Sequence, residues 1–229
     1  MRGLGVRLAT LLAMSLCTVP VLAGPLKGTV VLPVGFKPVT QRHATHWRVE
    51  NGVLAVAHPL RDPRTEMIVY LEGGKAPTPD KAQTAVMEVV GYRFDPYCVA
   101  ILAGGTVEFK NSGRVGHVIY DKQRVMPPTA IKPGESRKQK YHAEGEYEIR
   151  EEEFPHMRGV VKVLSTPLFV RPDAKGAFTI GSVPDGKWTV KVWYRGSVLV
   201  QTTAEVGADK PAEVVLKIPE PQAAAPAKK

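Results

Sequence analysis

Short apolar runs separated by turn-forming residues dominate the pattern of the chain. The clearest run is Lys187–Tyr194, where polar and apolar side chains alternate over eight positions. Such alternation is typical of a half-buried β-strand, because successive side chains point to opposite faces of a sheet. No window keeps the apolar period of an amphipathic helix, so the sequence predicts an all-β fold. The other expected strands are 26–32, 67–71, 86–90, 98–102, 106–109, 117–120, 147–150, 160–164, 176–180 and 214–218.

Turn and linker signals divide these strands into three groups. Asn51-Gly52 favours a tight hairpin turn, because both residue types tolerate a positive φ. Pro77 and Pro79 indicate a linker before the middle group of strands. Residues 219–229 are rich in Ala and Pro and are expected to be disordered.

The first 23 residues have the pattern of a signal peptide for export. Arg2 and Arg7 precede an apolar stretch, and Val21-Leu22-Ala23 resembles a cleavage site. A lipoprotein anchor at Cys17 is the alternative, although Leu16 suits that signal poorly. The rest of the chain has no apolar run long enough for a membrane helix. We therefore expect a periplasmic or secreted protein without a transmembrane segment.

Composition narrows the class of protein further. The chain has 229 residues, of which 44% are hydrophobic and 23% charged, as in an ordinary globular protein. Its formal net charge of +9 is scattered, and no aromatic side chains follow a basic stripe as nucleic-acid binders require. We therefore expect no nucleic-acid partner. Loss of residues 1–23 leaves Cys98 as the single cysteine, which excludes an internal disulfide and predicts a buried thiol.

The first and last groups of strands together resemble a known β-sandwich. Gly28-Thr29-Val30 and Ile68–Leu71 come early, and Asp173–Phe178 and Val183–Val190 come late. This arrangement is similar to the carboxypeptidase regulatory-like, or transthyretin-like, family. In that family two strands precede a D-x-x-G-x-F segment and a P-x-G-x-Y segment.

The two halves of this pattern are separated by the middle group of strands. Our hypothesis is that residues 24–80 and 165–218 form one discontinuous sandwich, with residues 81–164 inserted into it. Insertion requires the early strands to pair with residues 176–194.

The middle group resembles the cupredoxins, the family of small blue-copper proteins, over residues 85–164. Gly104–Asn111 follows the family's G-x-T-V-x-F-x-N segment. His117 stands six residues after Asn111, where the family has its first copper ligand. Met157–Val163 resembles the exit of the family's ligand loop. The resemblance implies a Greek-key β-sandwich, inserted in or packed beside a second, prealbumin-like sandwich.

The ligand loop departs from the family pattern. The family reads C-x-x-H-P-x-M, whereas residues 151–157 read E-E-E-F-P-H-M. Aligned on the Pro-x-Met end, Glu151 stands at the thiolate position and Phe154 at the second imidazole position. Of the His, Cys, His and Met ligands of a type 1 copper centre, His117 and Met157 remain.

Three interpretations of this loop stay open. In the first and preferred one, Phe154 plugs the former pocket, the site is vestigial and no cofactor binds. In the second, an altered, non-blue site holds Cu(II) or another divalent metal, because a carboxylate is a harder donor than a thiolate. The ligands of that site would be His117, Glu151 or Glu153, His156 and Met157. In the third, a ligand not located in the sequence completes a blue site.

No catalytic motif points to an enzyme. The sequence contains no H-E-x-x-H, phosphate loop or G-x-S-x-G segment. The preferred hypothesis is a non-enzymatic binding module whose partner is an envelope protein or a carbohydrate. Trp188, Trp193 and Tyr194 are candidates for an exposed aromatic surface, with one face of their strand in the core. Similar two-module proteins are labelled methylamine utilisation proteins, which suggests an accessory protein of an enzyme as a third class.

Overall fold

The computed structural model describes residues 23–38, 62–77, 83–207 and 211–220. This part of the chain forms strands β1 to β16 and one short 3-10 helix, η1 (Pro63–Glu66), so the all-β prediction is confirmed. Among the described residues no helix has the length and apolar character to cross a membrane. Most of the expected signal peptide, the Asn51-Gly52 turn and the tail beyond residue 220 lie outside the described residues.

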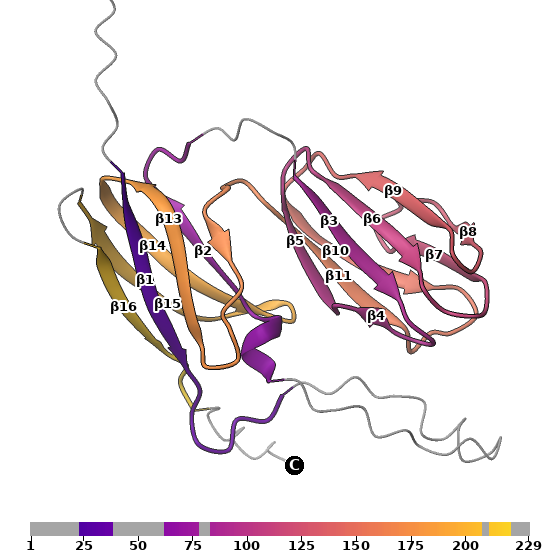
Figure 1. Cartoon of the computed structure of the whole chain (residues 1–229), viewed down its shortest axis with the longest axis horizontal. Coiled ribbons are helices and arrows are strands. Elements are labelled where there is room, and N and C mark those ends of the chain that lie inside the picture. Colours follow the sequence, from indigo (N-terminus) through magenta and orange to yellow (C-terminus); the bar gives the residue numbers. More distant parts are fainter. Residues whose placement is uncertain (1–22, 39–61, 78–82, 208–210, 221–229) are drawn as a thin grey trace, which may run out of the picture.

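The two ends of the chain build one β-sandwich, which we call the outer sandwich (Figure 1). Its first sheet has the order β13-β1-β16, with β13 (Ala177–Pro184), β1 (Ala23–Val31) and β16 (Ala212–Lys217). Its second sheet has the order β12-β2-β14-β15, with β12 (Phe169–Val170), β2 (Ile68–Gly73), β14 (Gly186–Tyr194) and β15 (Ser197–Val206).

The early strands pair with strands from the far end of the chain. In β1, Leu26 lies opposite Ile180 of antiparallel β13 and opposite Ala212 of parallel β16. In the second sheet β2 runs antiparallel to β14, with Leu71 opposite Val190. The pairing that insertion requires is therefore present, and the segment between β2 and β12 forms a sandwich of its own. The exact limits of the two parts stay a prediction.

One face of β14 is buried along the strand, and the other face is buried at its end, at Trp193. Trp188, Val190, Val192 and Tyr194 lie in the core of the outer sandwich, each at most 3% exposed. Trp193 belongs to a separate apolar cluster and is 1% exposed. The expectation of an exposed surface formed by Trp188, Trp193 and Tyr194 is therefore wrong, because a second sandwich covers the face that alternation alone leaves to solvent.

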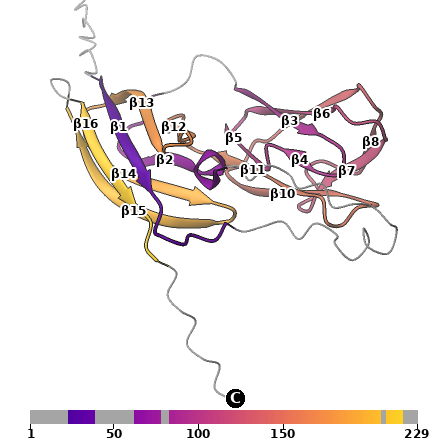
Figure 2. The same cartoon turned by 60° about the horizontal axis from the view of Figure 1, so that its bottom comes forward.

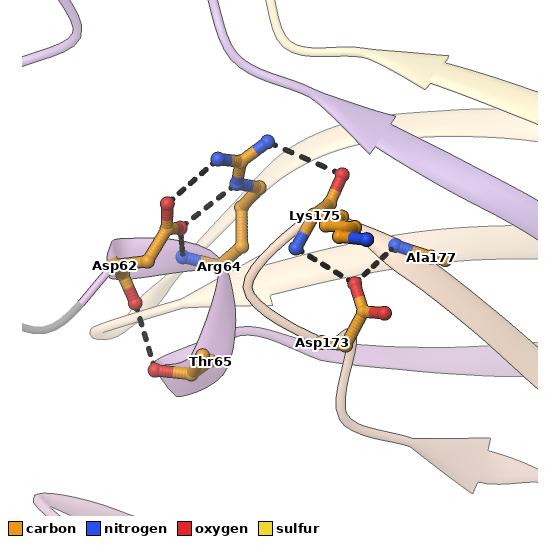
Figure 3. Close-up of polar contacts among 6 residues, drawn as sticks. All are labelled: Asp62, Arg64, Thr65, Asp173, Lys175 and Ala177. Atoms are coloured by element: carbon orange, nitrogen blue, oxygen red, sulfur yellow. Dashed lines mark hydrogen bonds and ion pairs between the residues drawn. The ribbon is translucent and has the colours of Figure 1, made fainter.

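The D-x-x-G turn before β13 is fixed by hydrogen bonds (Figure 3). Asp173 Oδ1 accepts from the backbone N–H groups of Lys175 and Ala177, each at 2.8 Å. Gly176 has a φ of +86°, and a Cβ there would collide with the carbonyl oxygen of Val30 in β1. Glycine is required at this position both by its backbone conformation and by the close approach to β1.

The helix η1 contacts the same turn (Figure 3). The guanidinium of Arg64 donates to both carboxylate oxygens of Asp62, with Nε to Oδ1 at 2.8 Å and Nη2 to Oδ2 at 2.6 Å. These hydrogen bonds lower the pKa of Asp62. Arg64 Nη1 also donates to the carbonyl of Lys175 at 3.3 Å. The chain therefore enters β2 from a point tied to the start of β13.

The middle segment forms the central sandwich, beside the outer one (Figures 1 and 2). Its five-stranded sheet has the order β5-β11-β10-β7-β8, with β5 (Cys98–Leu102), β11 (Arg158–Leu164), β10 (Gly145–Glu151), β7 (His117–Asp121) and β8 (Thr129–Ile131). Its four-stranded sheet has the order β4-β3-β6-β9, with β4 (Phe94–Asp95), β3 (Thr84–Val89), β6 (Thr106–Asn111) and β9 (Ser136–Lys140). Each sheet mixes early and late strands, as a Greek-key order does.

A third apolar cluster joins the two sandwiches. It consists of Ile68, Tyr70 and Trp193 from the outer sandwich with Cys98, Val160 and Leu164 from the central one. Trp193 Nε1 also donates to Glu146 Oε1 of β10 at 2.7 Å. Cys98 is fully buried, as predicted, and burial raises the pKa of its thiol to about 12.

Arg195 extends this contact from the turn between β14 and β15. Its guanidinium lies over the ring of Tyr97, 3.9 Å from the ring centre. Its Nε and Nη2 donate to Glu66 Oε2 at 2.9 and 2.6 Å. Tyr97 directly precedes β5, so this turn touches the central sandwich.

Candidate functional site

His117 begins β7 and is held by the loop that follows β6. Asn111, the last residue of β6, is fully buried. Its Nδ2 donates to the carbonyls of Val115 at 2.8 Å and Ile131 at 2.9 Å. Its Oδ1 accepts from the backbone N–H of Gly113 at 2.9 Å. The loop is thereby tied to β8. His117, which follows it, is a buried residue with an exposed fraction of 2%.

Glu151 ends β10 and buries its carboxylate beside β7. Strand pairing sets its position, because Glu151 lies opposite Ile119. Its Oε1 accepts from the backbone N–H of Val118 at 3.2 Å, and its Oε2 accepts from the backbone N–H of Phe154. Oε1 also lies 3.5 Å from Nδ1 of His117. A buried carboxylate is thus held by two backbone amides and faces one imidazole.

The imidazole of His117 has no hydrogen-bond partner within the described residues. Both Nδ1 and Nε2 are buried and unbonded there. The distance of 3.5 Å from Nδ1 to Glu151 Oε1 is within the range of an ion pair, but it is longer than a good N–H···O hydrogen bond. An unsatisfied buried polar group is destabilising by about 1–3 kcal/mol. The imidazole of His117 therefore keeps both of its nitrogens available for bonding in this part of the structure.

Aromatic rings surround this imidazole. The ring centre of half-buried Phe154 lies 5.9 Å from that of His117 and 4.7 Å from that of Tyr92. Tyr92 is 40% exposed and stands edge-on to His117 at 6.2 Å. The ring of His156 stands edge-on to that of Phe154, with 6.1 Å between the ring centres. A phenyl ring therefore stands beside His117, where the first interpretation expects an apolar plug.

The predicted metal ligands are placed in different ways. His117 and Glu151 face each other directly. Met157 is fully buried in the core cluster of the central sandwich, His156 is half-buried against Phe154, and Glu153 is exposed. Among the described residues no group of three or more His, Cys, Asp or Glu side chains is arranged to hold a metal ion. The four-residue ligand set stays a prediction.

The donors at the site do not fit a type 1 copper centre. Such a centre needs a thiolate and two imidazoles, with a weak axial thioether. Cys98 belongs to the cluster between the sandwiches, and its pKa of about 12 keeps it a thiol. One buried imidazole and one buried carboxylate are instead donors that suit Cu(II) or Zn(II).

Two residues of the site carry little signal in the sequence. Asn111 belongs to the G-x-T-V-x-F-x-N segment, but the segment does not reveal the three hydrogen bonds of its amide. Tyr92 lies between β3 and β4, and its contact with Phe154 depends on chain folding over a long separation. No local pattern could have placed it at the site.

Solved structures similar to this chain include small copper proteins. Amicyanin from Paracoccus versutus is 22% identical with a TM-score of 0.33, covering 38% of this chain and 85% of amicyanin. A purple cupredoxin from Nitrosopumilus maritimus is 20% identical with a TM-score of 0.32, covering 35% of this chain and 99% of that protein. A reduced amicyanin variant is 18% identical with a TM-score of 0.32, covering 42% and 99%.

Comparisons of sequence add no relative. No family of known proteins and no curated protein matches the chain. The β-sandwich architecture of the central segment follows from its own strand orders.

Proposed function

We propose that this protein is an exported, non-enzymatic binding module of the cell envelope, periplasmic or secreted. Its cupredoxin-like central sandwich serves as a scaffold with a vestigial copper site. The observation that carries the proposal is the carboxylate of Glu151 at the thiolate position, with both oxygens engaged by backbone amides. Phe154 beside His117 supports it, since a phenyl ring donates no electron pair to a metal. Without thiolate donation the site is unsuited to copper electron transfer.

The proposed partner is an envelope protein, with a carbohydrate as the alternative. An aromatic surface formed by Trp188, Trp193 and Tyr194 was expected to serve either kind of partner. Because these side chains are buried, β14 offers no aromatic platform to a protein or to a carbohydrate.

Metal retention tests the vestigial site. The chain from residue 24 onward would be incubated with excess Cu(II), dialysed and analysed for copper. We expect no stoichiometric copper and no intense visible absorption. One retained copper per chain would contradict the proposal, and a strong thiolate-to-copper absorption would also contradict the ligand assignment.

A second candidate function is the binding of a divalent metal in a non-blue site. The unpartnered imidazole of His117 opposite Glu151 favours it. Retained Cu(II) or Zn(II) that is lost in His117→Ala would support this candidate. The matched control is His142→Ala, because His142 is exposed and takes no part in the contacts around His117 described above.

A further inference from the structure

We propose that Glu151 is an internal anchor that holds the loop between β10 and β11 in place of a metal ion. The loop then keeps its conformation in the metal-free protein. This inference rests on the proposed function, in which the central sandwich holds no copper. It names the residue whose hydrogen bonds take over the structural role of a metal ion.

The anchor joins three segments of the chain. Glu151 itself ends β10, its Oε1 accepts from Val118 in β7, and its Oε2 accepts from Phe154 in the loop. His117, at the start of β7, faces the same carboxylate at 3.5 Å. The sequence resemblance places metal ligands at these same segments, so one carboxylate spans the positions that an ion would otherwise tie together.

Backbone bonding explains why the carboxylate is needed. The carbonyl of Val118 accepts from the N–H of Glu152 at 3.0 Å, and the carbonyl of Phe154 accepts from the N–H of Met157 at 2.8 Å. The N–H groups of Val118 and Phe154 are instead bonded to the Glu151 side chain. A charged acceptor forms stronger hydrogen bonds than a neutral one. Without Glu151 these two donors lose their partner.

Hydrogen exchange at two backbone amides tests the anchor. The chain from residue 24 onward, kept in a chelator, would be followed by NMR at Val118 and Phe154. In the unmodified protein we expect slow exchange that changes less than twofold on addition of Cu(II) or Zn(II). In Glu151→Ala we expect both amides to exchange at least about tenfold faster, which corresponds to about 1.4 kcal/mol.

Glu152→Ala is the matched control, because its side chain is exposed while its backbone bond to Val118 is kept. Both amides should exchange there as in the unmodified protein. If Glu151→Ala does not fold, the exchange rates of the unmodified protein with and without metal are the test of the anchor. Fast exchange of both amides in chelator, or a tenfold slowing on metal addition, overturns the anchor. Copper retention with amides already protected in chelator would contradict the vestigial site but leave the anchor standing.

Discussion

At the scale of single residues, the central sandwich departs at two positions from the sequence pattern that it resembles. In that pattern Glu151 stands where the family has a cysteine, and Phe154 stands where it has a histidine. His117 and Met157 keep the family's residue types and are both buried. Under the proposed function, the two strongest copper donors are missing while the surrounding β-sandwich is kept.

Replacing Glu151 by Cys and Phe154 by His together recreates C-x-x-H-P-x-M. We expect this double variant to bind one Cu(II) per chain and to gain an intense visible absorption, since thiolate donation to copper produces it. Visible spectra and copper analysis would measure the effect. Glu153→Cys with Phe154→His is the control with a misplaced thiol. A folded double variant that stays colourless would show that His117 and Met157 are not placed as copper ligands.

The buried thiol of Cys98 should make stability depend on alkaline pH. Its pKa is about 12 in the folded chain against an ordinary 9.0, so the unfolded chain loses the proton first as pH rises. The contribution is complete below pH 9 and is lost between about pH 9 and 12, at up to about 1.4 kcal/mol per pH unit. Urea unfolding between pH 8 and 11 should show a shallower decline for Cys98→Ala. Parallel declines would contradict the shift.

At the scale of elements, turns fix how the strands of the outer sandwich meet. The turn before β13 depends on Gly176, whose positive φ and contact with β1 leave no space for a side chain. We expect Gly176→Ala to lower the free energy of unfolding by about 2 kcal/mol or more. Denaturant unfolding measures it against Gly181→Ala in β13, where a Cβ would meet nothing within 4 Å. Equal losses in the two variants would contradict the role of the turn.

The turn between β14 and β15 should be coupled energetically to the helix η1 of the same sandwich. Arg195 and Glu66 form a half-buried pair at 2.6 Å, with Arg195 stacked on Tyr97. A double-mutant cycle with Arg195→Ala and Glu66→Ala should give a coupling of about 1 kcal/mol, from denaturant unfolding. The longer pair Lys122–Glu148, at 4.0 Å and with an exposed lysine, is the control and should give a value near zero. Additive effects of the Arg195 and Glu66 variants would refute the coupling.

At the scale of the whole molecule, the sequence predicts the strands and their class better than their surroundings. Alternation along Lys187–Tyr194 correctly indicates a strand, and the strict spacing around Gly176 indicates its turn. The same alternation does not reveal that Trp193 is buried, because a period of two along one strand carries no information about the second sandwich that packs against this side chain.

The sequence points to His117 and Glu151 but not to the geometry of their contact, and the full ligand set with His156 and Met157 stays a prediction. Aligning the loop placed Glu151 near His117, and the structure has the two side chains 3.5 Å apart. The engagement of Glu151 by the amides of Val118 and Phe154 could not be predicted, since it depends on the register between β7 and β10. The place of Tyr92 at the site could not be predicted for a similar reason, because its partners His117 and Phe154 lie far from it in the sequence.

The position of β1 between β13 and β16 has a consequence for synthesis. Residues 23–31 leave the ribosome early, whereas their parallel partner, residues 212–217, leaves almost last. The central sandwich contains all of its own strands and can close as soon as β11 has emerged. Until the final strands follow, the nascent chain exposes β1 and β2 without neighbours. A translation arrest or clipping before β16 would leave β1 without its parallel partner, as an open sheet edge able to pair with another chain.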